Sequence, residues 1–151
     1  MFKSKLYPVL LMVSIVTLLI AGCAQTPPAS EPAPTSDLED VTWILESYGE
    51  PGDLKAVLEG TEITALFDST EGHVRGSAGA NSYSGGYQIN ENELSIQQIA
   101  STEMFRLDPE GVMDQEYQYL KELQSAESYE IQDGRLQINC GEQILIYRIG
   151  D

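Results

Sequence analysis

The sequence has little histidine and little cysteine. His73 is the single histidine, and Cys23 and Cys140 are the two cysteines. Metal sites and hydrolase triads generally combine histidine with cysteine, serine or carboxylate side chains in set arrangements. One histidine beside Glu71 is typical of a surface or packing residue, and no G-x-S-x-G elbow, phosphate-binding loop or dinucleotide fingerprint is present. We therefore expect a protein that is not an enzyme, with no catalytic residues, no metal site and no cofactor.

Positive charge is also scarce. The chain has 8 Lys and Arg residues against 24 Asp and Glu, giving a formal net charge of −16. Nucleic acids and anionic lipid headgroups are bound through Lys and Arg, so we expect no nucleic-acid partner. The acidity is typical of a well-solvated surface. Attraction of a cationic partner or of divalent ions is the alternative, although no Asp-x-Asp-x-Asp-Gly calcium loop is present.

A long membrane-spanning run is missing as well. A bilayer-spanning helix needs about 20 apolar residues, and the apolar run at residues 6–20 is shorter. Lys3 and Lys5 precede this run, and Leu19-Ile20-Ala21-Gly22-Cys23 ends it. A basic start, a short apolar run and small residues before a cut site indicate a secretory signal peptide. A permanent membrane anchor is the alternative, but residues 19–23 match the bacterial lipobox. The cysteine sulfur of that motif takes a diacylglycerol.

These features divide the chain into three parts. Residues 1–22 are predicted to be the signal peptide, and residues 23–37 the lipidated Cys23 with a linker that is rich in proline. Such a linker cannot bury a core and forms an extended spacer. Residues 38–151 remain as one domain. We expect an exported protein, anchored to a membrane through lipidated Cys23, with its domain outside the cytoplasm. Cys140 alone cannot make an internal disulfide, and its turn-like context favours a structural thiol over a nucleophile.

Alternation of apolar and polar residues predicts a domain made mainly of strands. The last run, residues 144–149, is apolar at nearly every position, so we expect a central strand that is covered on both faces. Asp133-Gly134 is a strong hairpin signal between the two strands before it. The predicted strands lie at residues 41–46, 54–59, 63–68, 73–77, 83–89, 93–98, 128–132, 135–140 and 144–149.

One segment has the helical period instead. Asp108 is a suitable N-cap, and Pro109 suits the first helical position. Met113, Tyr117 and Leu120 then recur at helical spacing, with Val112, Leu123 and Ala126 alongside. We expect this stripe to face the core, and a ligand-binding stripe is the alternative. The predicted fold class is α+β, mainly β: an antiparallel barrel-like sheet of about eight short strands, capped by one amphipathic helix.

Three segments resemble the META/HslJ family of small envelope proteins. Residues 75–87 (RGSAGANSYSGGY) resemble the family's glycine-rich G-x-x-G-C-N-x-Y-x-G-x-Y pattern. Residues 99–104 (IASTEM) resemble its A-x-T-x-M segment, and residues 116–123 (EYQYLKEL) resemble its helix. Trp43 stands where the family has a W-x-L strand. The resemblance covers nearly all of residues 41–149.

The resemblance singles out residues at the first two segments. Glycines there allow bulges, positive φ or close backbone approach, and an Asn suits a turn and bonds local backbone. A tightly curved structural corner is one interpretation, and a recognition surface built on that corner is the other. Ala80 and Arg106 stand where the family often has cysteines, which implies a link in relatives that is absent here. The candidate residues are Gly76, Gly79, Asn81, Tyr83, Gly86, Tyr87, Thr102 and Met104.

The resemblance implies a non-catalytic envelope module that binds a protein partner or acts under stress. The alternative is a carrier of a small apolar ligand, such as a lipid, inside the barrel with the helix as its lid. An interior filled by Trp43, Phe67, Tyr87 and the helix would favour the first function. An interior lined by small residues, with space left, would favour the second. The expected partners are thus the membrane and an unknown envelope protein or apolar ligand.

We predict that Cys23→Ser leaves the protein unprocessed or releases it from the membrane fraction. Two or more acyl chains hold a protein firmly because each buried methylene contributes about 0.8 kcal/mol, and the variant has no sulfur to receive them. Fractionation and immunoblotting of cells measure the result, with Cys140→Ser as the matched control. Normal processing and membrane retention of Cys23→Ser would contradict the lipidation.

Overall fold

The computed structural model describes residues 37–150. The predicted signal peptide, Cys23 and the linker as far as Ser36 lie outside the described residues, so their assignment stays a prediction. Among residues 37–150, no helix is long and apolar enough to cross a bilayer.

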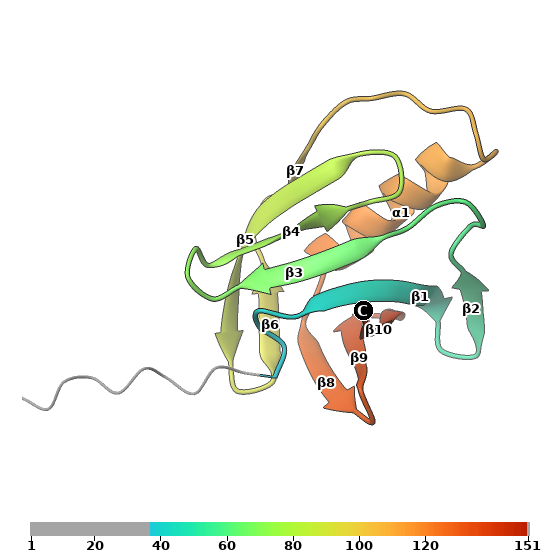
Figure 1. Ribbon diagram of the computed structural model, residues 1–151. Helices are drawn as coiled ribbons and strands as arrows, with labels where there is room; N and C mark the ends of the chain where they lie inside the picture. The colour runs from blue at the N-terminus through green and yellow to red at the C-terminus, as the bar shows by residue number, and fades with distance from the viewer. Residues whose placement is uncertain (1–36, 151) are drawn as a thin grey trace, which may run out of the picture. The chain divides into compact units, whose positions relative to one another are not determined.

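Strands dominate the described residues, with one helix between the seventh and eighth (Figure 1). The helix is α1 (Val112–Gln124). The ten strands are β1 (Thr42–Glu50), β2 (Asp53–Ala56), β3 (Thr64–Asp68), β4 (His73–Ser77), β5 (Ser82–Asn90), β6 (Glu93–Ile96), β7 (Ala100–Ser101), β8 (Ser128–Gln132), β9 (Arg135–Cys140) and β10 (Gln143–Ile149).

The strands form one antiparallel sheet that closes into a ring. Its order is β10-β9-β8-β6-β5-β4-β3-β1-β2, and β10 also pairs with β1. The pairing of β10 with β1 runs from Trp43 opposite Ile149 to Gly49 opposite Ile144. The shortest strand pairing in the ring is that of β6 with β8, which consists of the single residue pair Glu93 and Ser128. The predicted fold class, mainly β with one helix, is confirmed, with the sheet closed as a ring.

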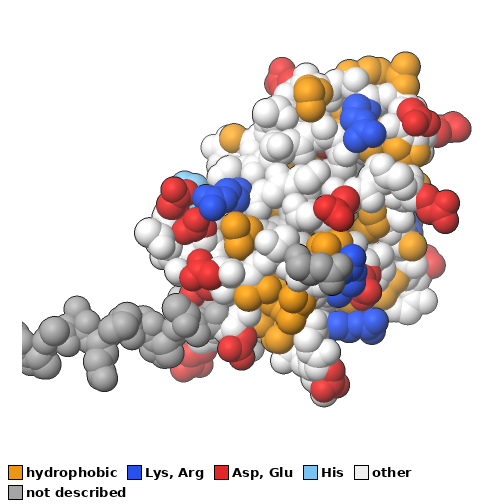
Figure 2. All heavy atoms as spheres, in the orientation of Figure 1, with side chains coloured by type: hydrophobic (Ala, Val, Ile, Leu, Met, Phe, Trp, Pro, Cys, Tyr) orange, Lys and Arg blue, Asp and Glu red, His pale blue; other side chains and the backbone are white. Residues whose placement is uncertain are grey.

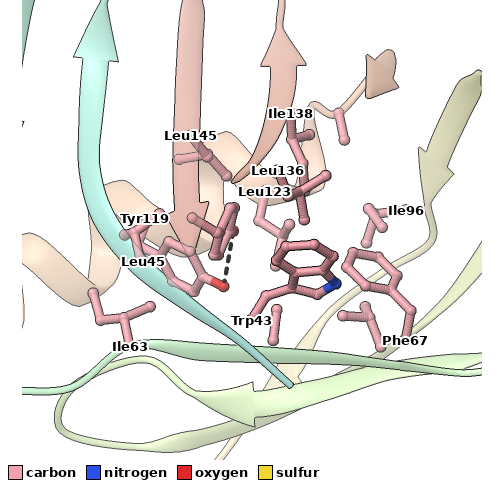
Figure 3. Close-up of a cluster of buried hydrophobic side chains, with 14 of the residues drawn as sticks. Trp43, Leu45, Ile63, Phe67, Ile96, Tyr119, Leu123, Leu136, Ile138 and Leu145 are labelled. Carbon is pink, nitrogen blue, oxygen red and sulfur yellow. Dashed lines mark hydrogen bonds between the residues drawn. The ribbon is translucent and has the colours of Figure 1, made fainter. Parts of the chain in front are cut away.

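Large aromatic side chains fill the centre of the ring. Trp43, Phe67, Tyr119 and Tyr147 are each at most 1% exposed. Figure 3 shows Trp43 beside Phe67, with Leu123 from the helix and Leu136 from β9 above it. Burying one large apolar side chain contributes roughly 1.5–3 kcal/mol, so this cluster is a main source of stability.

The polar atoms of these aromatic residues are paired inside the core. Trp43 Nε1 donates to the carbonyl of Leu38 at 2.9 Å. The hydroxyls of Tyr83 and Tyr119 are 2.7 Å apart, and Tyr147 donates to Tyr119 at 3.3 Å. Burial raises the pKa of all three tyrosines well above the ordinary value. The hydroxyls therefore stay neutral and remain donors at physiological pH.

Three strand predictions were incomplete or wrong. The strand predicted at 54–59 is the short β2, and Leu54 is 41% exposed because β2 pairs only with β1 and covers no core. The two-residue β7 was not predicted, since it is too short to show alternation. β10 is central, as predicted, but only its inward face is buried. Ile149 at its end is 48% exposed.

The predicted start of the helix was also wrong. The N-cap is Gly111 rather than Asp108, and Val112 is the first helical residue. Gly111 has a φ of 87°, a left-handed conformation that a right-handed helix cannot pass through. The Asp108–Pro109 peptide bond is cis.

The predicted core-facing stripe of the helix is right in part, since Val112, Leu123 and Ala126 are buried, but it is wrong at Tyr117 and lacks Tyr119. Tyr117 is 72% exposed, and Met113 and Leu120 are only partly buried. The apolar residues that α1 turns to the core are Val112, Tyr119 and Leu123. Polar residues share that buried face, namely Gln115, Glu116 and Glu122. An assignment that places apolar residues inside and polar residues outside therefore describes only part of this helix correctly.

The glycines of the first motif are constrained for different reasons, and this gives a test. A Cβ added at Gly76 would lie 2.0 Å from the backbone oxygen of Thr64. One added at Gly86 would meet only the end of the Gln97 side chain, at 2.7 Å. The expectation that Gly86 has positive φ or a close backbone contact is thus wrong, because its nearest neighbour is a flexible side chain.

We predict that Gly76→Ala lowers the free energy of unfolding by about 1–3 kcal/mol or more, the usual cost of forcing atoms into a packed site. Gly86→Ala is the control and should change stability by about 0.5 kcal/mol or less, since the side chain of Gln97 can move aside. Denaturant midpoints measure both. Equal midpoints for the two variants would show that the close approach of β4 to the Thr64 backbone does not exclude a side chain at position 76.

Candidate functional site

Four of the residues singled out by sequence lie together at a buried corner between β4 and β5, namely Gly79, Asn81, Thr102 and Met104. Asn81 lies there with only 3% of its surface exposed. Its Oδ1 accepts hydrogen bonds from Thr102 Oγ1 at 2.9 Å and from the backbone N–H of Met104 at 2.7 Å. Its Nδ2 donates to the Met104 carbonyl at 3.0 Å. One side chain thus fixes the segment that leads from β7 toward the helix.

Glu116 of α1 completes this corner. Its Oε1 accepts from Asn81 Nδ2 at 2.7 Å. Its Oε2 accepts from the backbone N–H groups of Asn81 at 2.7 Å and Ala80 at 3.2 Å. The carboxylate is buried, with 6% of the residue exposed. A buried carboxylate is stable only when hydrogen bonds replace its lost hydration, and these three bonds do so.

Further bonds tie α1 and the corner to neighbouring segments. Gln115 Oε1 accepts from the N–H of Leu58 at 2.7 Å, and its Nε2 donates to Thr61 Oγ1 at 3.1 Å. Arg106 Nη1 donates to the carbonyl of Gly79 at 2.8 Å. Ala80 follows Gly79 in sequence, so Arg106 lies next to Ala80. These are the two positions where the family often has cysteines, and here a hydrogen bond joins their segments instead.

The other candidate residues have separate places. Gly79 is in the corner with a φ of +104°, a conformation that suits glycine. The Tyr83 hydroxyl is in the core, where it donates to the Thr64 carbonyl at 2.9 Å. Tyr87 lies apart, with its hydroxyl on Glu39 Oε1 at 2.5 Å and its ring edge-on to Phe67. Gly79, Asn81, Thr102 and Met104 are thus brought together, and these inward contacts fit the structural interpretation of the motif.

Sequence reasoning missed Gln115 and Glu116 as members of this corner. Both are polar, and polar residues of an amphipathic helix usually lie on its outer face. The available signal was position alone, because Glu116 opens the third segment of the resemblance. Their partners are backbone N–H groups far away in the sequence, which no local pattern reveals.

A ridge on the outer face of α1 separates two hollows in the surface. The ridge consists of Tyr117, Lys121 and Ser125, which follow one another at intervals of four. The first hollow, here called the β7 groove, has a volume of about 580 Å³. It lies between α1 and the end of β7, and its lining residues are Ile99, Ser101, Met113, Glu116, Tyr117, Leu120, Lys121, Gln124 and Ser125.

Exposed apolar side chains lie on the segment between β7 and α1, which contacts the groove lining where the N–H of Arg106 reaches Met113 Sδ at 3.5 Å. Met104, Phe105 and Leu107 are 58%, 76% and 78% exposed, and all lie on the segment between β7 and α1. Figure 2 shows hydrophobic atoms along the edge of the molecule where that segment runs in Figure 1. Tyr117 in the groove lining is 72% exposed as well, so the fold leaves all four apolar side chains uncovered.

The free edge of β7 also faces this groove. The N–H of Thr102 donates to the Ser82 carbonyl of β5 at 3.0 Å. Because the backbone groups of a strand alternate in direction, the N–H and C=O of Ser101 point away from β5. The N–H of Ile99 also points away from β5, since it donates to Gln124 Oε1 on the helix at 3.5 Å. The groove therefore offers unpaired strand backbone beside apolar side chains.

The Cys140 thiol and the acidic side chains are further chemically active groups among residues 37–150. Cys140 is a free, buried thiol, and burial raises its pKa to about 12, with Glu122 and Glu127 adding to the shift. The thiolate that attacks substrates is therefore scarce at neutral pH. Among residues 37–150, no group of three or more His, Cys, Asp or Glu residues is placed to hold a metal ion.

The comparisons with known proteins agree with this architecture. A family model described as the META domain matches residues 36–149. The chain belongs to the META domain family. No curated protein is detectably similar to it in sequence.

Solved structures share the META domain fold of this chain. An NMR structure of a protein from Burkholderia xenovorans has a TM-score of 0.64 at 22% identity, covering 83% of this chain and 97% of that one. A crystal structure of a DUF4847 family protein from Bacteroides vulgatus has a TM-score of 0.54 at 12% identity, covering 74% and 94%. At these identities the likeness concerns the fold alone.

The META domain corner gives a second stability test. Glu116→Ala leaves the buried N–H groups of Ala80 and Asn81 without an acceptor, and each such group costs about 1–3 kcal/mol. We expect a loss well above that of Glu110→Ala, a surface control that should stay within about 0.5 kcal/mol. Denaturant midpoints measure both variants, and the Asn81→Ala, Glu116→Ala double variant should lose less than the two single losses added. Strict additivity would mean that the two side chains do not act together.

Proposed function

We propose that this META domain protein is a non-catalytic module, tethered to a membrane through lipidated Cys23, that binds a segment of an envelope protein in the β7 groove. The observation that carries the proposal is the exposure of Tyr117 in the groove lining and of Met104, Phe105 and Leu107 on the segment that contacts the lining at Met113. We propose that a role under stress, which the family resemblance implies, is exercised through the same groove.

The chemistry of this surface supports a protein partner. Soluble proteins seldom leave contiguous apolar side chains exposed, and such patches mark interaction sites. Aromatic residues and Met are enriched in the cores of protein interfaces, and Phe105, Tyr117 and Met104 are of these types. The corner under the surface is fixed by the bonds of Asn81 and Glu116, so the surface is preorganised and little ordering opposes binding.

The shape of the groove favours an extended segment. The outward-facing N–H and C=O of Ser101 can pair with one added strand, a mode of peptide recognition known as β-augmentation. Alternate side chains of that strand would point toward Leu120 and Met113, which line the groove. Main-chain pairing gives affinity in this mode, and the side-chain contacts give specificity.

Other partner classes fit less well. The net charge of −16 repels nucleic acid and anionic lipid surfaces alike. A ligand carried inside the ring would need the space that Trp43, Phe67, Tyr119 and Tyr147 fill. The groove on the outer face of α1 therefore has better support as a binding site than the interior.

Partner capture tests the proposal. We expect native co-purification of the lipidated protein to recover a protein partner, and a photoreactive benzoylphenylalanine at position 105 to crosslink to it. Phe105→Ser combined with Tyr117→Ala should reduce recovery at least tenfold, or about 1.4 kcal/mol, because aromatic anchors dominate interface energetics.

The matched control is Ile149→Ser, which changes another half-exposed apolar side chain outside the groove. It should leave recovery unchanged, and unfolding midpoints should confirm that all the variants fold. Undiminished recovery with the double variant would contradict the groove as the binding site. A lipid bound in stoichiometric amount and retained by the double variant would favour the carrier function instead.

A further inference from the structure

The second hollow lies on the other side of the α1 ridge and is here called the acidic hollow. Its volume is about 620 Å³. It shares the ridge residues Tyr117, Lys121 and Ser125 with the β7 groove. Its other lining residues are Asp114, Gln118, Glu122, Cys140, Glu142 and Gln143. A segment bound in the β7 groove that crosses the ridge therefore reaches this hollow.

Glu122 is the unusual residue of the acidic hollow. It is 6% exposed, yet only one of its carboxylate oxygens is paired. Oε1 accepts from Gln118 Nε2 at 2.9 Å, whereas Oε2 has no hydrogen-bond partner among the described residues. Buried polar atoms are nearly always paired, so an orphaned acceptor calls for a physical reason. Glu116, nearly two turns earlier on the same helix, has both oxygens satisfied by the corner.

The charged groups around Glu122 do not supply the missing partner. Lys55 of β2 and Lys121 of α1 lower its pKa by their charge, but burial outweighs them and the pKa is raised. Neither lysine forms an ion pair with it among the described residues. Tyr48, Cys140 and Tyr147 also face Glu122, and its charge contributes to the raised pKa of each. These three groups are therefore neutral at physiological pH.

The chemistry of the lining selects a cation as the occupant. Asp114 and Glu142 join Glu122 in the lining, and Lys121 is the one basic residue there. A donor that carries positive charge satisfies the free Oε2 and offsets the three carboxylates together. A metal ion fits less well, because no three acidic, His or Cys residues in the range 37–150 are grouped closely enough to hold one.

We propose that the acidic hollow receives a lysine or arginine side chain of the protein segment that binds in the β7 groove, and that this side chain donates a hydrogen bond to Oε2 of Glu122. The inference rests on the proposed function, since the groove brings the segment to the ridge. It adds the chemistry of the partner. The bound segment is extended, carries apolar residues in the β7 groove, and places a basic residue across the ridge in the acidic hollow. Such a segment also complements a protein with 24 acidic and 8 basic residues.

A small probe tests the hollow without the partner. n-Butylammonium reproduces the charged end of a lysine side chain, and 1-butanol is its neutral counterpart. In the processed lipoprotein held in detergent micelles, we expect butylammonium to shift the amide NMR signals of Glu122 and Cys140 in a saturable way. 1-Butanol should shift neither signal. Lys121→Gln should tighten butylammonium binding, because it removes the competing positive charge from the lining.

Glu122→Gln is the decisive variant. It keeps the shape of the side chain but removes its charge, and it should weaken butylammonium binding and recovery of the partner by about tenfold or more. Glu130→Gln removes the same charge from an exposed position on β8 and is the matched control. In the wild type, binding should weaken as the pH falls through the raised pKa of Glu122, because the proton and the cation compete for the carboxylate. Glu122→Gln should lack this pH dependence.

The two proposals fail separately. The proposal that a basic side chain occupies the acidic hollow is disproved if butylammonium causes no saturable shift, or causes the same shift in Glu122→Gln. The β7 groove is tested independently, by the variant that combines Phe105→Ser with Tyr117→Ala. If that double variant keeps the partner, the proposed function fails, and with it the claim that a groove-bound segment fills the hollow. Recovery of an amine-bearing lipid that depends on Glu122 would likewise overturn the protein side chain as the occupant.

Discussion

The carboxylate of Glu116 is the interaction on which the arrangement of this domain depends. It reaches from α1 to the backbone N–H groups of Ala80 and Asn81 and to the side chain of Asn81. Because these donors are buried and point in one direction, the helix can satisfy them in only one rotation about its axis. That rotation places Tyr119 in the core and leaves its neighbour Tyr117 outside. The bonds of Glu116, together with those of Gln115 to Leu58 and Thr61, thereby fix which face of the helix is available to other molecules.

The strands and the helix differ in how far sequence determines them. The alternation in β3, β5 and β9 follows directly from one buried and one outward face, so those segments were predicted well. The burial of Tyr119 rather than Tyr117 could not be predicted, because the two are identical residues and the choice between them lies in N–H groups dozens of residues away. For the same reason the motif residues Asn81, Thr102 and Met104 were found from sequence, whereas their partner Glu116 was not. The β7 groove exists only once the ring and helix are assembled.

The two faces of α1 show that polarity and exposure are separate properties in this protein. Glu116 and Glu122 are both buried at 6% exposure, while Met104, Phe105 and Leu107 are exposed. For Glu116 the physical origin is clear: the N–H groups of Ala80 and Asn81 need an acceptor, and the helix supplies it from its inner face. Glu122 has no bond to that corner and borders the acidic hollow instead.

The manner in which the chain enters the domain has a mechanical consequence. Leu38 is fully buried and its carbonyl is held by Trp43, while Glu39 pairs with Phe67 and the N–H of Asp40 bonds to the Phe67 carbonyl. A pull on the chain ahead of Leu38 therefore acts first on contacts with β1 and β3, beside the buried side chains of Trp43 and Phe67. Neither β7 nor α1 belongs to that first set of contacts. Tension at the amino terminus is thus resisted before it can distort the outer face of the helix.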